Sequence, residues 1–177
     1  QLLRLFDLLD VKLFTNFSGA TLTVASDAIL NIQAGTTFAG VVTNLGTVNW
    51  LASNFSILTN GPTVTGTIWN QAGGLFDIQC DQVVANGAAL ATFHNAGIVR
   101  KRTTTGVTTF NTAFDNSGTV EVQTGTINFA GGATQGGTFK ASSGAAINFN
   151  GGTYTLSRPP DFQGAGQIQM TGGHLTL

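Results

Sequence analysis

Side chains able to perform acid–base chemistry are few, since the 177-residue chain contains eight acidic residues and two histidines. A polysaccharide lyase or hydrolase would need clustered carboxylates with a basic partner. One such cluster could form if successive segments of the chain lie side by side. Its members are Asp77, Asp81, Arg100, Lys101 and Glu121. We favour a structural role for these charges over a catalytic one.

The other reactive side chains stand apart from one another. His94 and His174 lack metal-ligating companions at useful spacing, so we interpret both as turn or surface residues. Cys80 alternates with Phe76 and Ile78 and is expected to be a small core residue rather than a nucleophile. Glycine pairs precede strand-like rather than helical segments, which indicates corners rather than phosphate loops. We therefore expect no catalytic residue, no metal, no cofactor and no enzyme.

The composition narrows the classes of fold and partner. Charged residues make up 8% of the chain, the formal net charge is −1, and 24 residues are glycine. A nearly neutral chain is poorly suited to nucleic acids. No apolar stretch reaches the roughly 20 residues of a transmembrane helix, so we expect no membrane span. Abundant Thr, Val, Ile and Phe favour strands, while Gly and Asn supply the positive φ angles of tight corners.

Two recurring units predict the fold. The first is a small turn followed by Gly-Thr-Val or a similar strand, and its asparagines, Asn44, Asn70, Asn95 and Asn116, lie 26, 25 and 21 residues apart. The second is an apolar strand closed by a glycine turn, as in Ile127–Gly132. Periods of this length without helical periodicity fit one β-coil per repeat. The sequence therefore predicts an all-β, single-stranded parallel β-solenoid of about seven coils of 20–26 residues.

Stacking the first units in register aligns residue types at two neighbouring positions, starting from a weaker copy at residues 16–22. The inward column contains Leu22, Val48, Phe76, Val99, Val120 and Phe139. The outward column contains Thr23, Asn49, Asp77, Arg100, Glu121 and Lys140. The last four outward residues alternate in sign, and we interpret them as a structural ladder that fixes register. Lys101 falls at an inward place, where we expect a bulge or a side chain that reaches out to solvent.

The N-terminal segment differs from the repeats. Residues 1–14 place Leu2, Leu5, Phe6 and Leu9 among their apolar positions. This pattern predicts a short amphipathic helix that caps the solenoid of residues 15–177. The alternative is a strand that leaves the body and pairs with a neighbouring subunit. Because the chain begins with Gln1, we expect it to be processed or a fragment.

The other end of the chain suggests assembly. Residues 174–177 stop in the middle of a strand-like pattern. A bare last coil exposes unpaired N–H and C=O groups, so either the natural protein continues or this edge meets another chain. Head-to-tail contacts do not close and generate filaments. Leu175 and Leu177, together with the apolar N-terminal residues, are therefore candidates for assembly.

Threonines raise one further possibility. Thr-rich β-solenoids can present flat Thr-x-Thr arrays that bind ice, and Thr21-Leu22-Thr23 and Thr153-Tyr154-Thr155 fit this pattern. The outward column that can be aligned is charged, which makes ice binding a minor alternative.

Residues 116–156 contain Asn-Ser-Gly-Thr-Val-Glu-Val-Gln-Thr-Gly-Thr-Ile-Asn-Phe and, later, Gly-Gly-Thr-Tyr-Thr-Leu. This stretch resembles the β-strand-repeat segments of large bacterial surface proteins, namely autotransporter passengers and filamentous-haemagglutinin-like adhesins. The resemblance covers residues 116–177 well and most of residues 16–177 loosely. It implies a parallel β-solenoid, a secreted or cell-surface location and an adhesive or scaffolding role, and it carries no catalytic residues.

The expected function is that of a non-enzymatic extracellular structural protein whose copies stack head-to-tail into a filament. The alternative is a stalk or adhesive segment of a bacterial surface adhesin, which would bind glycans or a host surface. An ice-binding solenoid and a polysaccharide-active β-helix enzyme rank below these two.

Overall fold

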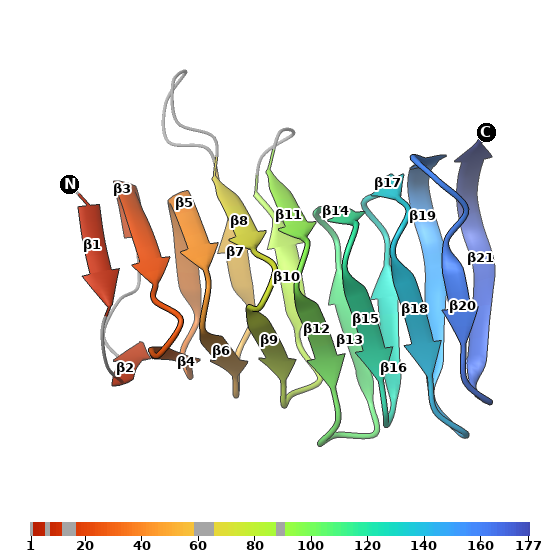
Figure 1. Ribbon diagram of the computed structural model, residues 1–177, viewed down its shortest axis with the longest axis horizontal. Helices are drawn as coiled ribbons and strands as arrows, with labels where there is room; N and C mark the ends of the chain where they lie inside the picture. The colour runs from red at the N-terminus through yellow and green to blue at the C-terminus, as the bar shows by residue number, and fades with distance from the viewer. Residues whose placement is uncertain (1, 6–7, 12–16, 59–65, 88–90) are drawn as a thin grey trace.

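The computed structural model describes residues 2–5, 8–11, 17–58, 66–87 and 91–177 and shows a rod of stacked β-coils (Figure 1). About seven turns follow one another along the rod. The described strands pair in parallel, each with the equivalent strand of the coil before or after it. The parallel β-solenoid predicted from the repeats is confirmed.

Each full coil contributes to three faces. Face 1 is the eight-stranded sheet of β2 (Leu8–Val11), β4 (Ile29–Ile32), β6 (Thr47–Trp50), β9 (Leu75–Ile78), β12 (Ile98–Lys101), β15 (Thr119–Val122), β18 (Thr138–Ala141) and β20 (Asp161–Gln163). Faces 2 and 3 are branches of the 13-stranded sheet. Face 2 contains β7 (Phe55–Ile57), β10 (Val83–Asn86), β13 (Val107–Phe110) and β16 (Thr126–Phe129). Face 3 contains β1 (Leu2–Leu5), β8 (Thr67–Asn70), β11 (Thr92–Asn95), β14 (Ala113–Asn116) and β17 (Ala133–Gln135). Four long strands bend from face 2 into face 3: β3 (Phe17–Val24), β5 (Thr36–Asn44), β19 (Ala146–Leu156) and β21 (Gln167–Thr176).

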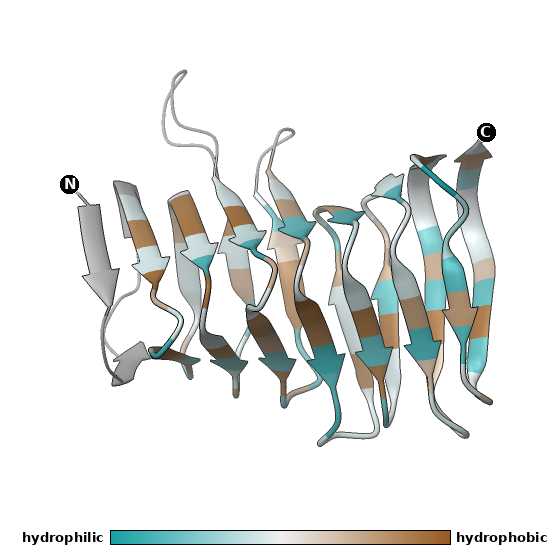
Figure 2. Ribbon diagram, in the orientation of Figure 1, coloured by the Kyte–Doolittle hydropathy of each residue, from teal (hydrophilic) through white to brown (hydrophobic). Residues whose placement is uncertain are grey.

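Apolar side chains fill the interior of the rod. Along β15, for example, Val120 and Val122 are buried whereas Glu121 is partly exposed, and the alternating bands of Figure 2 show this period of two on many strands. Aromatic rings from successive coils pack edge to face, as Phe76 and Phe93 do with ring centroids 5.0 Å apart. Such contacts add about 0.5–1.5 kcal/mol each beyond the burial of area, so the aromatic core ties neighbouring coils together.

The repeated asparagines form a buried ladder at the corner between faces 3 and 1. The Nδ2 of Asn44 donates to Oδ1 of Asn70 at 2.7 Å, Asn70 donates to Asn95 at 2.8 Å, and Asn95 donates to Asn116 at 2.8 Å. The same amide nitrogens donate to backbone carbonyls of the next coil, for example that of Leu75 at 3.0 Å. The corner therefore satisfies its buried amides internally, which is the condition for burying polar groups.

Glycine follows this ladder because successive corners pass very close to each other. A Cβ atom at Gly118 would lie 2.3 Å from the carbonyl oxygen of Gly97. No other residue leaves room for that approach, which explains the recurrent Asn-x-Gly triplet of the sequence.

Two expectations about the first coils are wrong. The predicted N-terminal helix does not form, because residues 2–5 and 8–11 are strands whose backbones pair with β3 and β4 of the same chain. The weaker repeat copy at residues 16–22 was also misaligned, since Leu30 and not Leu22 lies opposite Val48. Val24 occupies the ladder position in that coil, so the asparagine that marks the later corners is missing there.

Candidate functional site

The charged column on face 1 lies in register. Asp77 is opposite Arg100, Arg100 is opposite Glu121, and Glu121 is opposite Lys140. Two ion pairs form along it, from Arg100 Nε to Asp77 Oδ1 at 2.9 Å and from Lys140 Nζ to Glu121 Oε1 at 3.3 Å. The sequence alignment had assigned these four residues to the positions that they occupy.

Asp77 is held more tightly than the alignment suggested. Its side chain is only 1% exposed because Arg102 adds a second guanidinium, with Nη2 2.9 Å from Asp77 Oδ2. Burial by itself would raise the pKa of Asp77, but hydrogen bonds from Arg102 and Arg100 outweigh it and hold the pKa below its usual value. A carboxylate that stays ionised beneath two guanidinium groups is poorly suited to act as a general acid or base.

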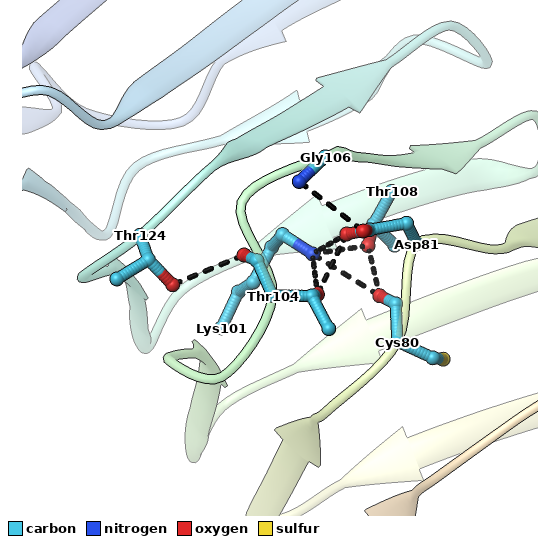
Figure 3. Close-up of polar contacts among 7 residues, drawn as sticks. All are labelled: Cys80, Asp81, Lys101, Thr104, Gly106, Thr108 and Thr124. Atoms are coloured by element: carbon cyan, nitrogen blue, oxygen red, sulfur yellow. Dashed lines mark hydrogen bonds and ion pairs between the residues drawn. The ribbon is translucent and has the colours of Figure 1, made fainter.

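Lys101 neither causes a bulge nor reaches solvent, so that expectation is wrong. Register across Arg100 and Lys101 is continuous with β15, and the Lys101 side chain is fully buried. As Figure 3 shows, its ammonium group is surrounded by acceptors from the preceding coil and its own turn. The acceptors are Asp81 Oδ1 at 2.5 Å, Thr104 Oγ1 at 2.8 Å, Thr108 Oγ1 at 3.1 Å and Cys80 O at 3.1 Å.

Partners of this ammonium are themselves fixed. Asp81 also accepts hydrogen bonds from the Thr104 hydroxyl at 2.6 Å and from the Gly106 N–H at 3.1 Å. Burial raises and these contacts, with Lys101, lower the pKa of Asp81, and the net shift is downward. Burial raises the pKa of the Cys80 thiol to about 12. The group is therefore a closed polar core in which the thiol stays protonated, and it is poorly suited to nucleophilic chemistry.

Sequence reasoning missed an aromatic and charged cluster on face 3. His94 lies on β11 and stacks on Trp69 of β8, with ring centroids 3.9 Å apart and planes inclined by 15°. Its Nδ1 lies 2.7 Å from Asp115 Oδ2, and Asp115 Oδ1 accepts the backbone N–H of Thr134 at 2.7 Å. A signal was available, because Trp69, His94 and Asp115 each immediately precede an asparagine of the ladder.

The same outward column decides how the threonines are arranged. Thr23 and Thr43 precede Trp69, and Thr134, Thr155 and Thr176 follow Asp115. Two tryptophan and histidine rings and a carboxylate therefore interrupt the column, so face 3 lacks the long, flat threonine array that the ice-binding alternative requires.

The C-terminal end of the rod is open. Core positions continue onto the last coil, where Phe162 lies opposite Phe139, Met170 opposite Phe149 and Leu175 opposite Tyr154. These last-coil side chains are exposed, Leu175 by 51%, and they border an apolar hollow of about 240 Å³.

The other assembly candidates are placed less fully. Leu177 is also exposed. Leu2 and Leu5 belong to β1 and Leu9 belongs to β2, whereas Phe6 lies outside the described residues.

Comparison with protein families, with curated proteins and with solved structures finds no match to this chain. Within the described ranges, no group of three or more His, Cys, Asp and Glu side chains could hold a metal ion. The part of the chain that the structure describes also contains no helix long and apolar enough to cross a membrane.

Proposed function

We propose that the chain is a non-enzymatic structural protein of the cell exterior, a β-solenoid whose copies stack head-to-tail into a filament. The observation that carries this proposal is the open last coil, where Phe162, Met170 and Leu175 occupy core positions yet remain exposed. Contiguous exposed apolar surface of this kind marks interaction sites. A second copy of the coil is the occupant that would extend the same core.

The two ends of the rod are suited to each other. β1 and β2 begin faces 3 and 1, whereas β20 and β21 end faces 1 and 3, and each of these strands pairs on one side only among the described strands. The first register step, from Leu2 to Thr21, is 19 residues, and the last, from Thr153 to His174, is 21. Both end coils are thus smaller than the central coils of about 26 residues, as from Val41 to Thr67. Coils of similar perimeter can meet end to end.

The non-enzymatic part of the proposal is supported by the state of the charged residues. In the cluster that could have been catalytic, Asp77 is paired with Arg100 and Arg102, Asp81 with Lys101, and Glu121 with Lys140. These pairs leave little for substrate binding and serve the stacking of coils. The external location is supported by the resemblance of the repeats to those of bacterial surface proteins.

Light scattering after size-exclusion chromatography, run over a hundredfold range of protein concentration, tests the assembly. We expect a mass that rises with concentration, together with filaments in negative-stain electron micrographs. One subunit of about seven coils would advance such a filament by about 34 Å at ~4.8 Å per coil.

A pair of matched variants locates the contact. Leu175→Lys, in the open coil, should give monomeric rods, because it places a charge in an interface that must be apolar. Ile98→Lys makes the same kind of change on the side of the rod, at a residue 44% exposed, and should leave assembly intact. A wild-type protein that stays monomeric at every concentration would refute the filament and favour the stalk of a surface adhesin.

A further inference from the structure

We propose that face 3 carries a binding site for a linear, neutral glycan, built around Trp69 and His94. The inference does not depend on filament formation, since the site lies on the side of the rod rather than at an end. It starts from a surface hollow of about 170 Å³ that extends from Trp69 on β8 to Ser157 just after β19.

The hollow is elongated along the rod. One wall is the outward column of Trp69, His94, Asp115 and Thr134, and the other is the corner column that follows the asparagine ladder. The corner column is Gln71, Ala96, Ser117, Gly136 and Ser157, each of which donates its N–H to the residue at the end of the preceding coil's strand. Because Ala96 and Gly136 are small, the groove stays open between the polar side chains. Its course across several coils suits a chain-like ligand better than a compact one.

The aromatic wall is held in place before any ligand arrives. Trp69 is 40% exposed, and one face of its indole is fixed by the stacked imidazole of His94. His94 is fixed by Asp115, which is fixed in turn by the N–H of Thr134. Such preorganisation reduces the entropic cost of binding, which a shallow surface site needs.

The chain of contacts also determines which atoms face the ligand. Since His94 Nδ1 donates to Asp115, Nε2 is the nitrogen left for a ligand. Neither Nε2 nor the indole N–H of Trp69 has a partner among the described residues. With the amide of Gln71 and the hydroxyls of Ser117 and Ser157, they give the groove donors and acceptors beside an exposed aromatic edge.

These groups select the chemical class of the ligand. No Lys or Arg lines the hollow, and the carboxylate of Asp115 is already engaged by His94 and a backbone N–H, which disfavours an anion and a metal ion. The many polar lining groups disfavour a purely apolar ligand. A saccharide combines hydroxyl groups with apolar C–H surface, and a linear one can follow the groove.

The test is a titration with four soluble probes, cellohexaose, xylohexaose, mannohexaose and chitohexaose, followed by tryptophan fluorescence. The chain has two tryptophans, and Trp50 is fully buried, so a ligand-induced change reports on Trp69. We expect saturable binding of at least one probe, weakened about tenfold by Trp69→Ala, when followed by calorimetry, because an aromatic contact contributes about 1 kcal/mol. His94→Ala should weaken binding severalfold, since it frees the indole and removes Nε2.

Val107→Ala is the matched control, because Val107 is another exposed residue on a different face, and it should leave binding unchanged. Circular dichroism would establish that each variant keeps its strands. Absence of saturable binding by all four probes up to about 10 mM, a limit equivalent to about −2.7 kcal/mol, would overturn the proposal. Binding that Trp69→Ala and His94→Ala leave unchanged would overturn it as well. Either result leaves the filament proposal to its own test of mass and morphology.

Discussion

The ammonium group of Lys101 and the carboxylate of Asp81 should contribute very unequally to stability. Lys101 is fully buried, whereas the side chain of Asp81 is 36% exposed. Asp81→Ala would leave a buried ammonium without its counter-charge, and such a loss typically costs about 3–5 kcal/mol. Because Cys80 O, Thr104 Oγ1 and Thr108 Oγ1 remain as acceptors, we expect a cost near the lower limit, about 3 kcal/mol.

Lys101→Met should be far less costly. It removes the buried charge and fills the same space with an apolar side chain, a replacement that is often neutral or stabilising. Asp81 can then turn toward solvent while retaining its bonds from Thr104 and Gly106. We expect a change in the free energy of unfolding of less than about 1 kcal/mol, and the double variant should resemble Lys101→Met alone.

Urea denaturation followed by circular dichroism measures these differences. A loss of about 3 kcal/mol would also lower the melting temperature by roughly 6–12 °C in a protein of this size. If Asp81→Ala cost less than Lys101→Met, the account of Lys101 as a buried charge that needs its partner would be refuted.

Three further changes test other parts of the rod by the same denaturation assay. Asn95→Leu breaks the buried ladder and should cost about 3 kcal/mol, because it leaves buried amide groups on both sides unpaired, whereas Asn49→Ala in a partly exposed pair should cost about 0.5 kcal/mol or less; equal costs would contradict the ladder. Asp77→Asn should flatten the fall of stability in acid: the lowered pKa of Asp77 means that its contribution is complete above about pH 4 and is lost as the pH falls through the pKa of the folded state. An unchanged acid limb would show that Asp77 does not titrate as described. Gly118→Ala should cost about 2 kcal/mol, since the added Cβ would press on the carbonyl of Gly97, and a neutral result would mean that the corner is looser than it looks.

The body of the fold could be predicted because one set of contacts recurs in coil after coil. Asn44, Asn70, Asn95 and Asn116 share a corner, and so their spacing measures the coil directly. The charged column of face 1 follows each corner at a constant distance, which made its register readable. Where the marker is absent, as at Val24, the alignment failed.

Features that depend on neighbours in space were harder to foresee. The spacing of leucines near the N-terminus fits a helix, yet the open edges of β3 and β4 offer backbone partners that override this preference. Lys101 was recognised as inward-facing, but its acceptors come from turns whose geometry the repeat does not encode. The Trp69 and His94 pair required face 3 to be aligned through coils of unequal length.

The asparagine ladder gives the rod an electrical direction. Each Nδ2 points toward the C-terminal coil, and its orientation is fixed because Leu75 O, Ile98 O and Thr119 O can only accept hydrogen bonds. The amide dipoles of Asn44, Asn70 and Asn95 therefore add along the axis instead of cancelling, with their positive ends toward the C-terminus. Hydrogen bonds in such a row polarise one another. A rod built this way has two unlike poles, and like poles repel, so end-to-end contact between copies is biased toward one polarity.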